Sequence, residues 1–247
     1  LRYAAGAPTV DRSYPWGAFW CLVPDPERRW SGTLHQRYDG PRRMAGILPV
    51  GTLPTDPGGP PKVSFFWSVR ADGFEAWLER GIGSWHDEMR AYWPDAEPVW
   101  GAIRDPAQLA RATYRDVVFR SSVAPGLAVI GDAAHAMSPQ LGQGANLALV
   151  DALFLGEALA GARADTVDGA LRRYDRARRG HVRFYQRASR WLTPMFQSER
   201  RFAGLLRDWS FPLVQRLPVL RSEAGAVLAG TKRGWLRRID PDRWRRP

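Results

Sequence analysis

Residues 127–151 read LAVIGDAAHAMSPQLGQGANLALVD, and this stretch decides the fold. It opens with a short apolar run, Leu127–Ile130, which ends at Gly131-Asp132, a pattern typical of a buried strand that leads into a turn. A proline and two glycines follow, and from Ala145 onward apolar residues recur at helical spacing. The stretch therefore predicts a strand, a glycine-containing turn and a helix in close succession.

Such an arrangement favours a ligand site where the strand ends. In α/β sheets, ligands lie beyond the carboxyl ends of the strands, where Asp132 is expected to accept hydrogen bonds from ligand hydroxyls. Gly142 and Gly144 allow the backbone to approach a ligand closely. The helix after them presents free N–H groups and the positive end of its dipole. Taken singly, each glycine is equally compatible with a tightly packed corner between strand and helix.

The whole string resembles the second FAD-binding motif of the flavoprotein monooxygenases built like para-hydroxybenzoate hydroxylase. The family pattern is a Gly-Asp-Ala-Ala-His run, a proline, a Gly-x-Gly-x-Asn run and a helix with an acidic position. All of these stand in order between Gly131 and Asp151. The resemblance implies an FAD-dependent aromatic-ring hydroxylase, and a fold of mixed α+β and α/β class that forms the C-terminal part of the family's FAD/NAD(P)-binding architecture.

The resemblance also implies residue roles. Asp132 would bind the ribityl hydroxyls of FAD, and Pro139 would lie beside the isoalloxazine ring. The loop before the helix would approach the flavin N1–C2=O edge, where a helix N-terminus stabilises the negative charge of reduced flavin. His135 would hold the turn. The implied cofactor-binding residues are Gly131, Asp132, Pro139, Gly142, Gly144, Ala145 and Asn146; no catalytic residue and no metal ligand is assigned.

An antiparallel sheet is predicted before the motif. Alternating and aromatic-rich segments indicate strands at 14–23, 33–38, 43–50 and 63–69. One face of such a sheet packs and the other can line a pocket. A register slip of one residue exchanges the faces, and core packing is the alternative for each side chain. The candidate substrate-pocket residues are Trp20, His35, Arg37 and Trp67.

The remaining periodicity predicts helices and one further strand. Apolar spacing indicates a helix over 74–93 that Gly81 and Gly83 weaken, a strand over 113–119 and a helix from about Thr166 that stops before Pro194. The tail is expected to form helical pieces cut by prolines at 212, 218 and 241. The predicted domains are a substrate-domain sheet with a helix (1–110), the C-terminal part of the FAD-binding domain (111–165) and a helical region (166–247).

Composition narrows the function classes. The 247 residues carry 36 basic and 25 acidic side chains, a net charge of +11, and all but two of the basic residues are arginine. We interpret the arginine-rich runs around 172–190 and 232–246 as solvated surface, because no nucleic-acid motif accompanies them. A single cysteine, Cys21, excludes an internal disulfide. No apolar run reaches membrane-spanning length, and no signal peptide is evident, so a cytoplasmic location is expected.

The family's opening Gly-x-Gly-x-x-Gly unit is not found in the sequence. We therefore expect a truncated chain that lacks the N-terminal dinucleotide-binding segment. The complete protein would use FAD, with NAD(P)H as a transient reductant and O2, to hydroxylate an aromatic or polyketide-like substrate through a flavin C4a-hydroperoxide. The alternatives are an inactive relic or binding protein of the same fold, and a flavin-dependent reductase or halogenase.

Overall fold

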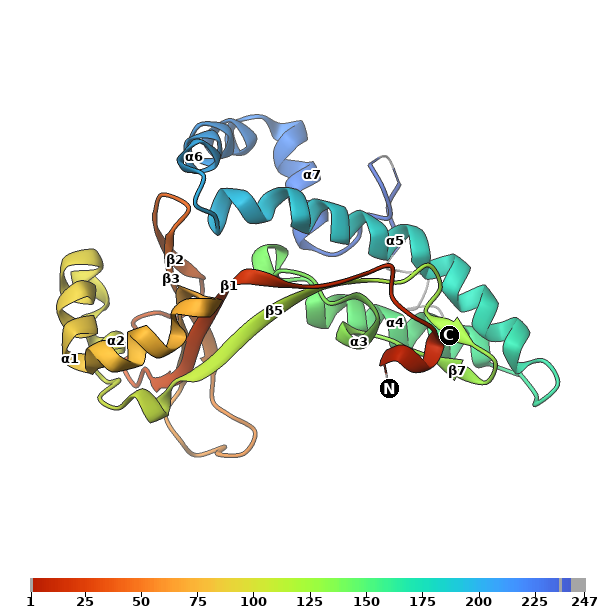
Figure 1. Ribbon diagram of the computed structural model, residues 1–247, viewed down its shortest axis with the longest axis horizontal. Helices are drawn as coiled ribbons and strands as arrows, with labels where there is room; N and C mark the ends of the chain where they lie inside the picture. The colour runs from red at the N-terminus through yellow and green to blue at the C-terminus, as the bar shows by residue number, and fades with distance from the viewer. Residues whose placement is uncertain (1, 236, 241–247) are drawn as a thin grey trace. The chain divides into compact units, whose positions relative to one another are not determined.

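The computed structural model describes residues 2–235 and 237–240, which form two compact units (Figure 1). The sheet unit comprises Tyr14–Thr113 and Met195–Leu205. The motif unit comprises the residues up to Ser13, then Tyr114–Pro194, and the residues from Leu206 onward. The division predicted after residue 110 lies close to the junction of the two units, whereas the division predicted after residue 165 falls inside the motif unit.

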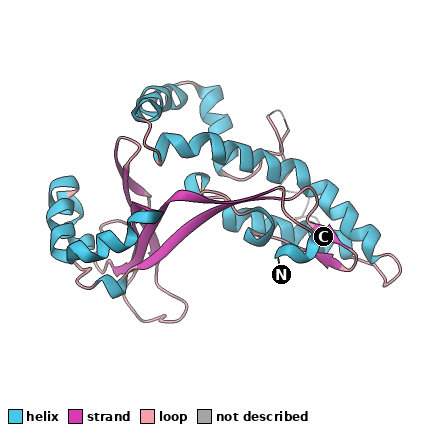
Figure 2. Cartoon of the chain, viewed as in Figure 1, coloured by secondary structure: helices cyan, strands magenta, loops and turns pink. Residues whose placement is uncertain are grey.

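A five-stranded sheet with the order β2-β3-β4-β1-β5 organises the sheet unit. Figure 2 draws the strands in magenta. The pairs β2–β3, β3–β4 and β4–β1 are antiparallel. The expected antiparallel sheet and the mixed α+β class are confirmed, and all four predicted N-terminal strands occur. The strands are β1 (Val10–Pro24), β2 (His35–Asp39), β3 (Arg43–Gly51), β4 (Lys62–Arg70) and β5 (Ala110–Val118).

The register separates the two faces of this sheet. Phe19 lies opposite Trp67, and both are buried, whereas the next pair along, Trp20 and Phe66, lies on the other face. The first face packs against α1 (Phe74–Tyr92) and α2 (Glu97–Trp100), because the same buried cluster contains side chains of all these elements. That core includes Phe19, Ile47, Phe65, Trp67, Phe74, Trp77, Trp85, Met89, Val99 and Trp100.

Helix α1 bends where the sequence predicts weakness. Gly81 has φ 77° and ψ 161°, a non-helical conformation that side-chain-bearing residues rarely adopt. The bend lets Trp77 and Trp85, which flank it, both reach the core, where their rings lie 5.7 Å apart. The glycine therefore interrupts the helix without removing its apolar face from the sheet.

The motif unit is mainly helical. The short hairpin β6 (Val123–Ala124) and β7 (Leu127–Ala128) leads into α3 (Asp132–His135), α4 (Gly144–Leu159) and α5 (Val167–Phe196), and α6 (Arg201–Arg216) and α7 (Pro218–Leu228) follow. The last residues of α5 and the first of α6 belong to the sheet unit. Only Leu127–Ala128 of the predicted strand 127–130 is strand. The short 3-10 helices are Arg2–Ala5, Ala71–Gly73, Pro94–Ala96, Pro106–Gln108 and Pro139–Leu141.

Two prolines do not end their helices as predicted. Helix α5 continues through Pro194 to Phe196, and α6 continues through Pro212. A proline removes one helical hydrogen bond; Pro194 lies near the end of its helix, and Pro212 is exposed, so that water can replace the lost donor. Pro218 does start a helix, at the position where proline is favoured. Pro241 and the tail arginines beyond Asp240 lie outside the described residues.

Among the described helices, none is long and apolar enough to cross a membrane.

The sheet core predicts unequal effects for two tryptophans. Trp85 is 2% exposed, and Trp20, on the other face, is 41% exposed. Replacing Trp85 with Ala is expected to lower the free energy of unfolding by about 3–5 kcal/mol, because it leaves a large cavity. Trp20→Ala is the matched control, with an expected loss below about 1 kcal/mol. Urea denaturation followed by circular dichroism measures both; equal losses would contradict the assignment of faces.

Candidate functional site

The residues 131–146 form the predicted turn and helix start in the motif unit. Gly131 has φ 59° and ψ −146°, and Gly142 has φ 62°, so both turns require the freedom of glycine. Between them, Pro139 begins a 3-10 turn. Helix α4 begins at Gly144, and its N-cap residue, Gln143, makes no side-chain capping bond. The start of a 16-residue helix is therefore presented without a side-chain cap.

Exposure separates the residues of this turn into a rim and a base. Asp132, Pro139, Gly142 and Ala145 are exposed, and Gly144 and Asn146 are half-buried. Of the seven predicted cofactor-binding residues, only Gly131 is buried. The buried base includes His135, Gln143, Leu147 and Asp151. The turn thus offers backbone and one carboxylate at its surface, while other side chains hold it from below; contact with a cofactor stays a prediction.

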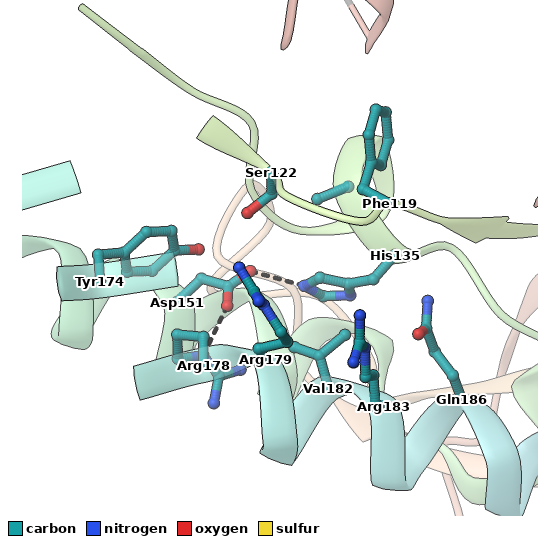
Figure 3. A pocket seen from close by; sticks show the side chains of 11 residues that line it. Phe119, Ser122, His135, Asp151, Tyr174, Arg178, Arg179, Val182, Arg183 and Gln186 are labelled. Atoms are coloured by element: carbon teal, nitrogen blue, oxygen red, sulfur yellow. Dashed lines mark hydrogen bonds and ion pairs between the residues drawn. The ribbon is translucent and has the colours of Figure 1, made fainter. Parts of the chain in front are cut away.

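Asp151, in α4, is the centre of the base (Figure 3). Its side chain is completely buried and accepts three hydrogen bonds. The Gly131 N–H donates over 2.9 Å, His135 Nε2 over 2.6 Å and Arg178 Nε over 2.7 Å. One carboxylate therefore joins the turn before α3, the end of α3 and the long helix α5.

The charge of Asp151 is maintained by these donors. Burial by itself raises the pKa of a carboxyl, but the hydrogen bond from His135, with the charges of His135 and Arg178 and the Gly131 N–H, outweighs it. The resulting pKa is about 2, below the ordinary 3.8. Asp151 is consequently ionised at neutral pH, and each of its donors is held by an ion rather than by a neutral acceptor.

Arg178 extends this network to a second histidine. Its guanidinium also donates to the Leu147 carbonyl over 3.2 Å and to Nδ1 of His181. Because arginine can only donate, Nδ1 must accept, and the His181 proton lies on Nε2, which donates to the Gly230 carbonyl over 3.0 Å. Burial, followed by the Arg178 charge, lowers the pKa of His181 from 6.5 to about 3, so its ring is neutral.

A small pocket adjoins the network (Figure 3). Its volume is about 40 Å³, which suffices for about three water molecules and not for a flavin or an aromatic substrate. The pocket is therefore part of the base of the turn and not a substrate site. Its lining includes Ser122, His135, Asp151, Tyr174, Arg178 and Gln186.

The four predicted substrate-pocket residues do not share one face of the sheet. Trp67 is 4% exposed and contacts Trp85 and Tyr92 in the core. His35 packs its ring on Trp30, and Arg37 lies over the ring of Tyr92, so both belong to the same packed face. Only Trp20 lies on the opposite face.

Sequence reasoning missed the partner of Trp20 on that face. Phe66 lies opposite Trp20 in the register, and its ring covers Gly46, where an added Cβ would lie 2.1 Å from a ring carbon. A glycine directly across from an aromatic residue on the neighbouring strand is the signal that could have identified this pair. A substrate that uses this face would meet Trp20 and Phe66.

The buried arginine of α5 was also missed. The run around 172–190 is predicted to be solvated, which is wrong for Arg178, because this residue is 2% exposed. Its distinguishing signal is the position of His181 one turn later on the same helix, since a shared face places both toward α4. Composition alone could not separate Arg178 from its exposed neighbours.

Comparison with known proteins adds independent findings. The sequence model of the family described as FAD binding domain matches residues 67–189. Over 188 residues the chain is 42% identical to 3-amino-4-hydroxybenzoate 2-monooxygenase PtmB3 of Streptomyces platensis, covering 76% of this chain and 44% of that protein. It is 29% identical to 6-methylpretetramide 4-monooxygenase of Streptomyces rimosus over 181 residues, 69% of this chain and 42% of the relative.

A solved structure agrees in fold. Klebsiella pneumoniae HpxO, determined with FAD and uric acid, superposes with a TM-score of 0.69 at 22% identity, over 93% of this chain and 57% of that chain. The chain spans less than half the length of the curated relatives it matches.

The network predicts a strong effect at Asp151. Asp151→Asn leaves Arg178 buried without its counter-ion, and the expected loss is about 3–5 kcal/mol of unfolding free energy. Asp165→Asn, in an exposed ion pair with Arg163, is the matched control and should lose less than about 1 kcal/mol. Urea denaturation at pH 7 measures both. A small loss for Asp151→Asn would show that the carboxylate does not hold the turn.

His181 predicts the pH dependence of stability. Because its folded pKa, about 3, lies below 6.5, the unfolded chain binds its proton more readily, and stability falls as pH drops from 6.5 toward 3. Asp151 adds a loss only below 3.8. His181→Gln should flatten the pH dependence between 6.5 and 4 by up to about 1.4 kcal/mol per pH unit. An unchanged slope in His181→Gln would contradict the buried neutral ring.

Proposed function

Because the chain belongs to the FAD-dependent aromatic-ring hydroxylases built like para-hydroxybenzoate hydroxylase, we propose that it acts as an NAD(P)H-driven monooxygenase with the turn at 131–146 as its flavin site. The uncapped start of α4, beside the exposed carboxylate of Asp132, is the observation that carries the proposal. Bound FAD would supply the redox chemistry, accepting electrons from a nicotinamide and activating O2.

The chemistry of the turn fits the ribityl and isoalloxazine end of FAD. Asp132 is placed to accept hydrogen bonds from hydroxyls, as a carboxylate does from a sugar chain. The first N–H groups of α4, at Gly144, Ala145 and Asn146, would stabilise negative charge on the ring edge, because they lie at the positive end of the helix dipole. Gly142 and Gly144 have no side chains that would cover this backbone. The space around Gly142 is also open, because an added Cβ there would meet no atom within 4 Å.

For the substrate we propose an aromatic or polyketide-like ring compound. Support comes from the names of the relatives, of which PtmB3 is a 3-amino-4-hydroxybenzoate 2-monooxygenase. It also comes from the sheet face opposite the core, where the exposed Trp20 and the half-buried Phe66 offer flat apolar surfaces. Aromatic side chains of this kind pack against planar rings with offset or edge-to-face geometry.

Flavin fragments test the proposed site directly. The 247 residues contain no Gly-x-Gly-x-x-Gly fingerprint for the FAD diphosphate. We therefore expect riboflavin, FMN and FAD to bind this chain with dissociation constants within about tenfold of one another, which flavin fluorescence measures. Asp132→Asn should weaken riboflavin by about 10- to 100-fold, the range for losing hydrogen bonds to a charged group. Asp165→Asn is the control. Failure of all three flavins to bind, or binding unaffected by Asp132→Asn, would contradict the proposed site.

Activity is tested separately. With FAD and NADPH or NADH supplied, the protein should oxidise the nicotinamide faster when an aminohydroxybenzoate is added, and the product should carry one oxygen atom from ¹⁸O2. Nicotinamide oxidation without a hydroxylated product, across a panel of benzoates and fused-ring phenols, would favour a reductase. Flavin binding with no turnover would favour an inactive binding protein.

A further inference from the structure

The segment 226–232, which comprises the end of α7 and the four residues after it, lies against the start of α4 within the motif unit. Gln143 Nε2 donates to the Leu228 carbonyl over 2.7 Å, and the Tyr185 hydroxyl donates to the Val227 carbonyl over 3.0 Å. The N–H of Lys232 donates to the same tyrosine oxygen over 3.2 Å. The segment is thus bound by its backbone to both α4 and α5.

Gly230 is the point of closest approach. It has φ +74°, and an added Cβ would lie 1.8 Å from Asn146 Nδ2 and 2.7 Å from Gln143 Oε1. These two atoms are themselves joined by a hydrogen bond of 2.8 Å. Any side chain at position 230 must therefore displace Asn146 and Gln143, the residues at the start of α4.

The same glycine also ends the charged network. Its carbonyl accepts the Nε2–H of His181, whose ring accepts from Arg178, which in turn pairs with Asp151. Asp151 holds the Gly131 N–H at the other end of the turn. A continuous chain of hydrogen bonds therefore joins segment 226–232 to both sides of the 131–146 turn.

Lys232 fixes the far end of the segment. Its side chain is buried, and its ammonium donates to Glu223 over 2.5 Å and to the Trp235 carbonyl over 2.6 Å. Together with α7, these contacts hold Gly230 from both directions. The segment is therefore held in place by hydrogen bonds at both of its ends.

We propose that segment 226–232 is a positioning element for the flavin-binding turn, and that Gly230 sets the conformation of Gln143 and Asn146 at the start of α4. The segment holds the Gln143 side chain beneath the helix, away from the N–H groups that a flavin would use. This inference rests on the proposed function for its ligand, but the contacts themselves are independent of flavin. By linkage, flavin binding and docking of the segment strengthen each other by the same factor.

Three glycine substitutions test the proposal in the full chain. Gly230→Ala introduces both backbone strain and the collision with Asn146. Gly161→Ala, at φ +71° with nothing within 4 Å, introduces strain alone, and Gly225→Ala, with open space in α7, introduces neither. Hydrogen exchange of the amides at 141–147 without flavin, the dissociation constant for riboflavin and the midpoint of urea unfolding are measured for each.

Gly230→Ala should speed exchange at 141–147 at least tenfold and weaken riboflavin about tenfold, with a changed visible spectrum of the bound flavin. Gly161→Ala and Gly225→Ala should leave the exchange at 141–147, the riboflavin affinity and the flavin spectrum unchanged. Tyr185→Phe, which removes one hydroxyl that holds the segment, should shift exchange in the same direction by a smaller factor, and it serves if Gly230→Ala fails to fold.

Wild-type exchange at 141–147 in Gly230→Ala would overturn the proposal, as would equal effects from Gly161→Ala. Changed exchange with unchanged riboflavin affinity would also overturn it, because the segment would then be structural only. If wild-type protein binds no riboflavin, the proposed function fails, while the exchange measurement still decides whether the segment positions the turn.

Discussion

A buried carboxylate that must stay ionised dominates the motif unit. Asp151 has no exposure to water, so its charge is tolerated only because three donors converge on it from the turn, from α3 and from α5. Each donor comes from a different segment, so the requirement to satisfy one ion fixes the positions of three segments at once. Removal of the charge would leave Arg178 buried and unpaired, which makes the arrangement cooperative.

The need to bind the buried Asp151 carboxylate explains which residues of the turn are held in its base and which are exposed to a ligand. Side chains that could compete for a ligand, such as Gln143 and His135, are bound within the base, whereas the rim consists of glycines, an alanine, a proline and one carboxylate. A flavin would therefore meet backbone N–H groups and Asp132. Because His181 is neutral, its ring accepts from Arg178 and donates to the Gly230 carbonyl without adding a buried positive charge.

Secondary structure and turns were predictable from the sequence where they depend on the residues of one continuous segment. The strand, turn and helix of 127–159, the antiparallel sheet and the weak point at Gly81 follow from spacing and from the conformational needs of glycine and proline. Two predicted helix ends were wrong, because Pro194 and Pro212 lie where the loss of one backbone hydrogen bond costs little. The sheet faces were not predictable, since alternation allows either register; His35, Arg37 and Trp67 turned out to lie on the packed face. The contacts of Arg178, His181 and Gly230 join segments far apart in the chain, and the spacing of Arg178 and His181 on one helix face is the one local hint of them.

We propose that the start of α4 is the flavin-binding surface of this chain. Backbone amide shifts in ¹⁵N-labelled protein, recorded while riboflavin is added, test it most directly. We expect saturable shifts that are largest at Gly142, Gly144, Ala145 and Asn146, with smaller shifts at Asp132. Shifts confined to the sheet unit, or no saturable shifts at these amides, would contradict it.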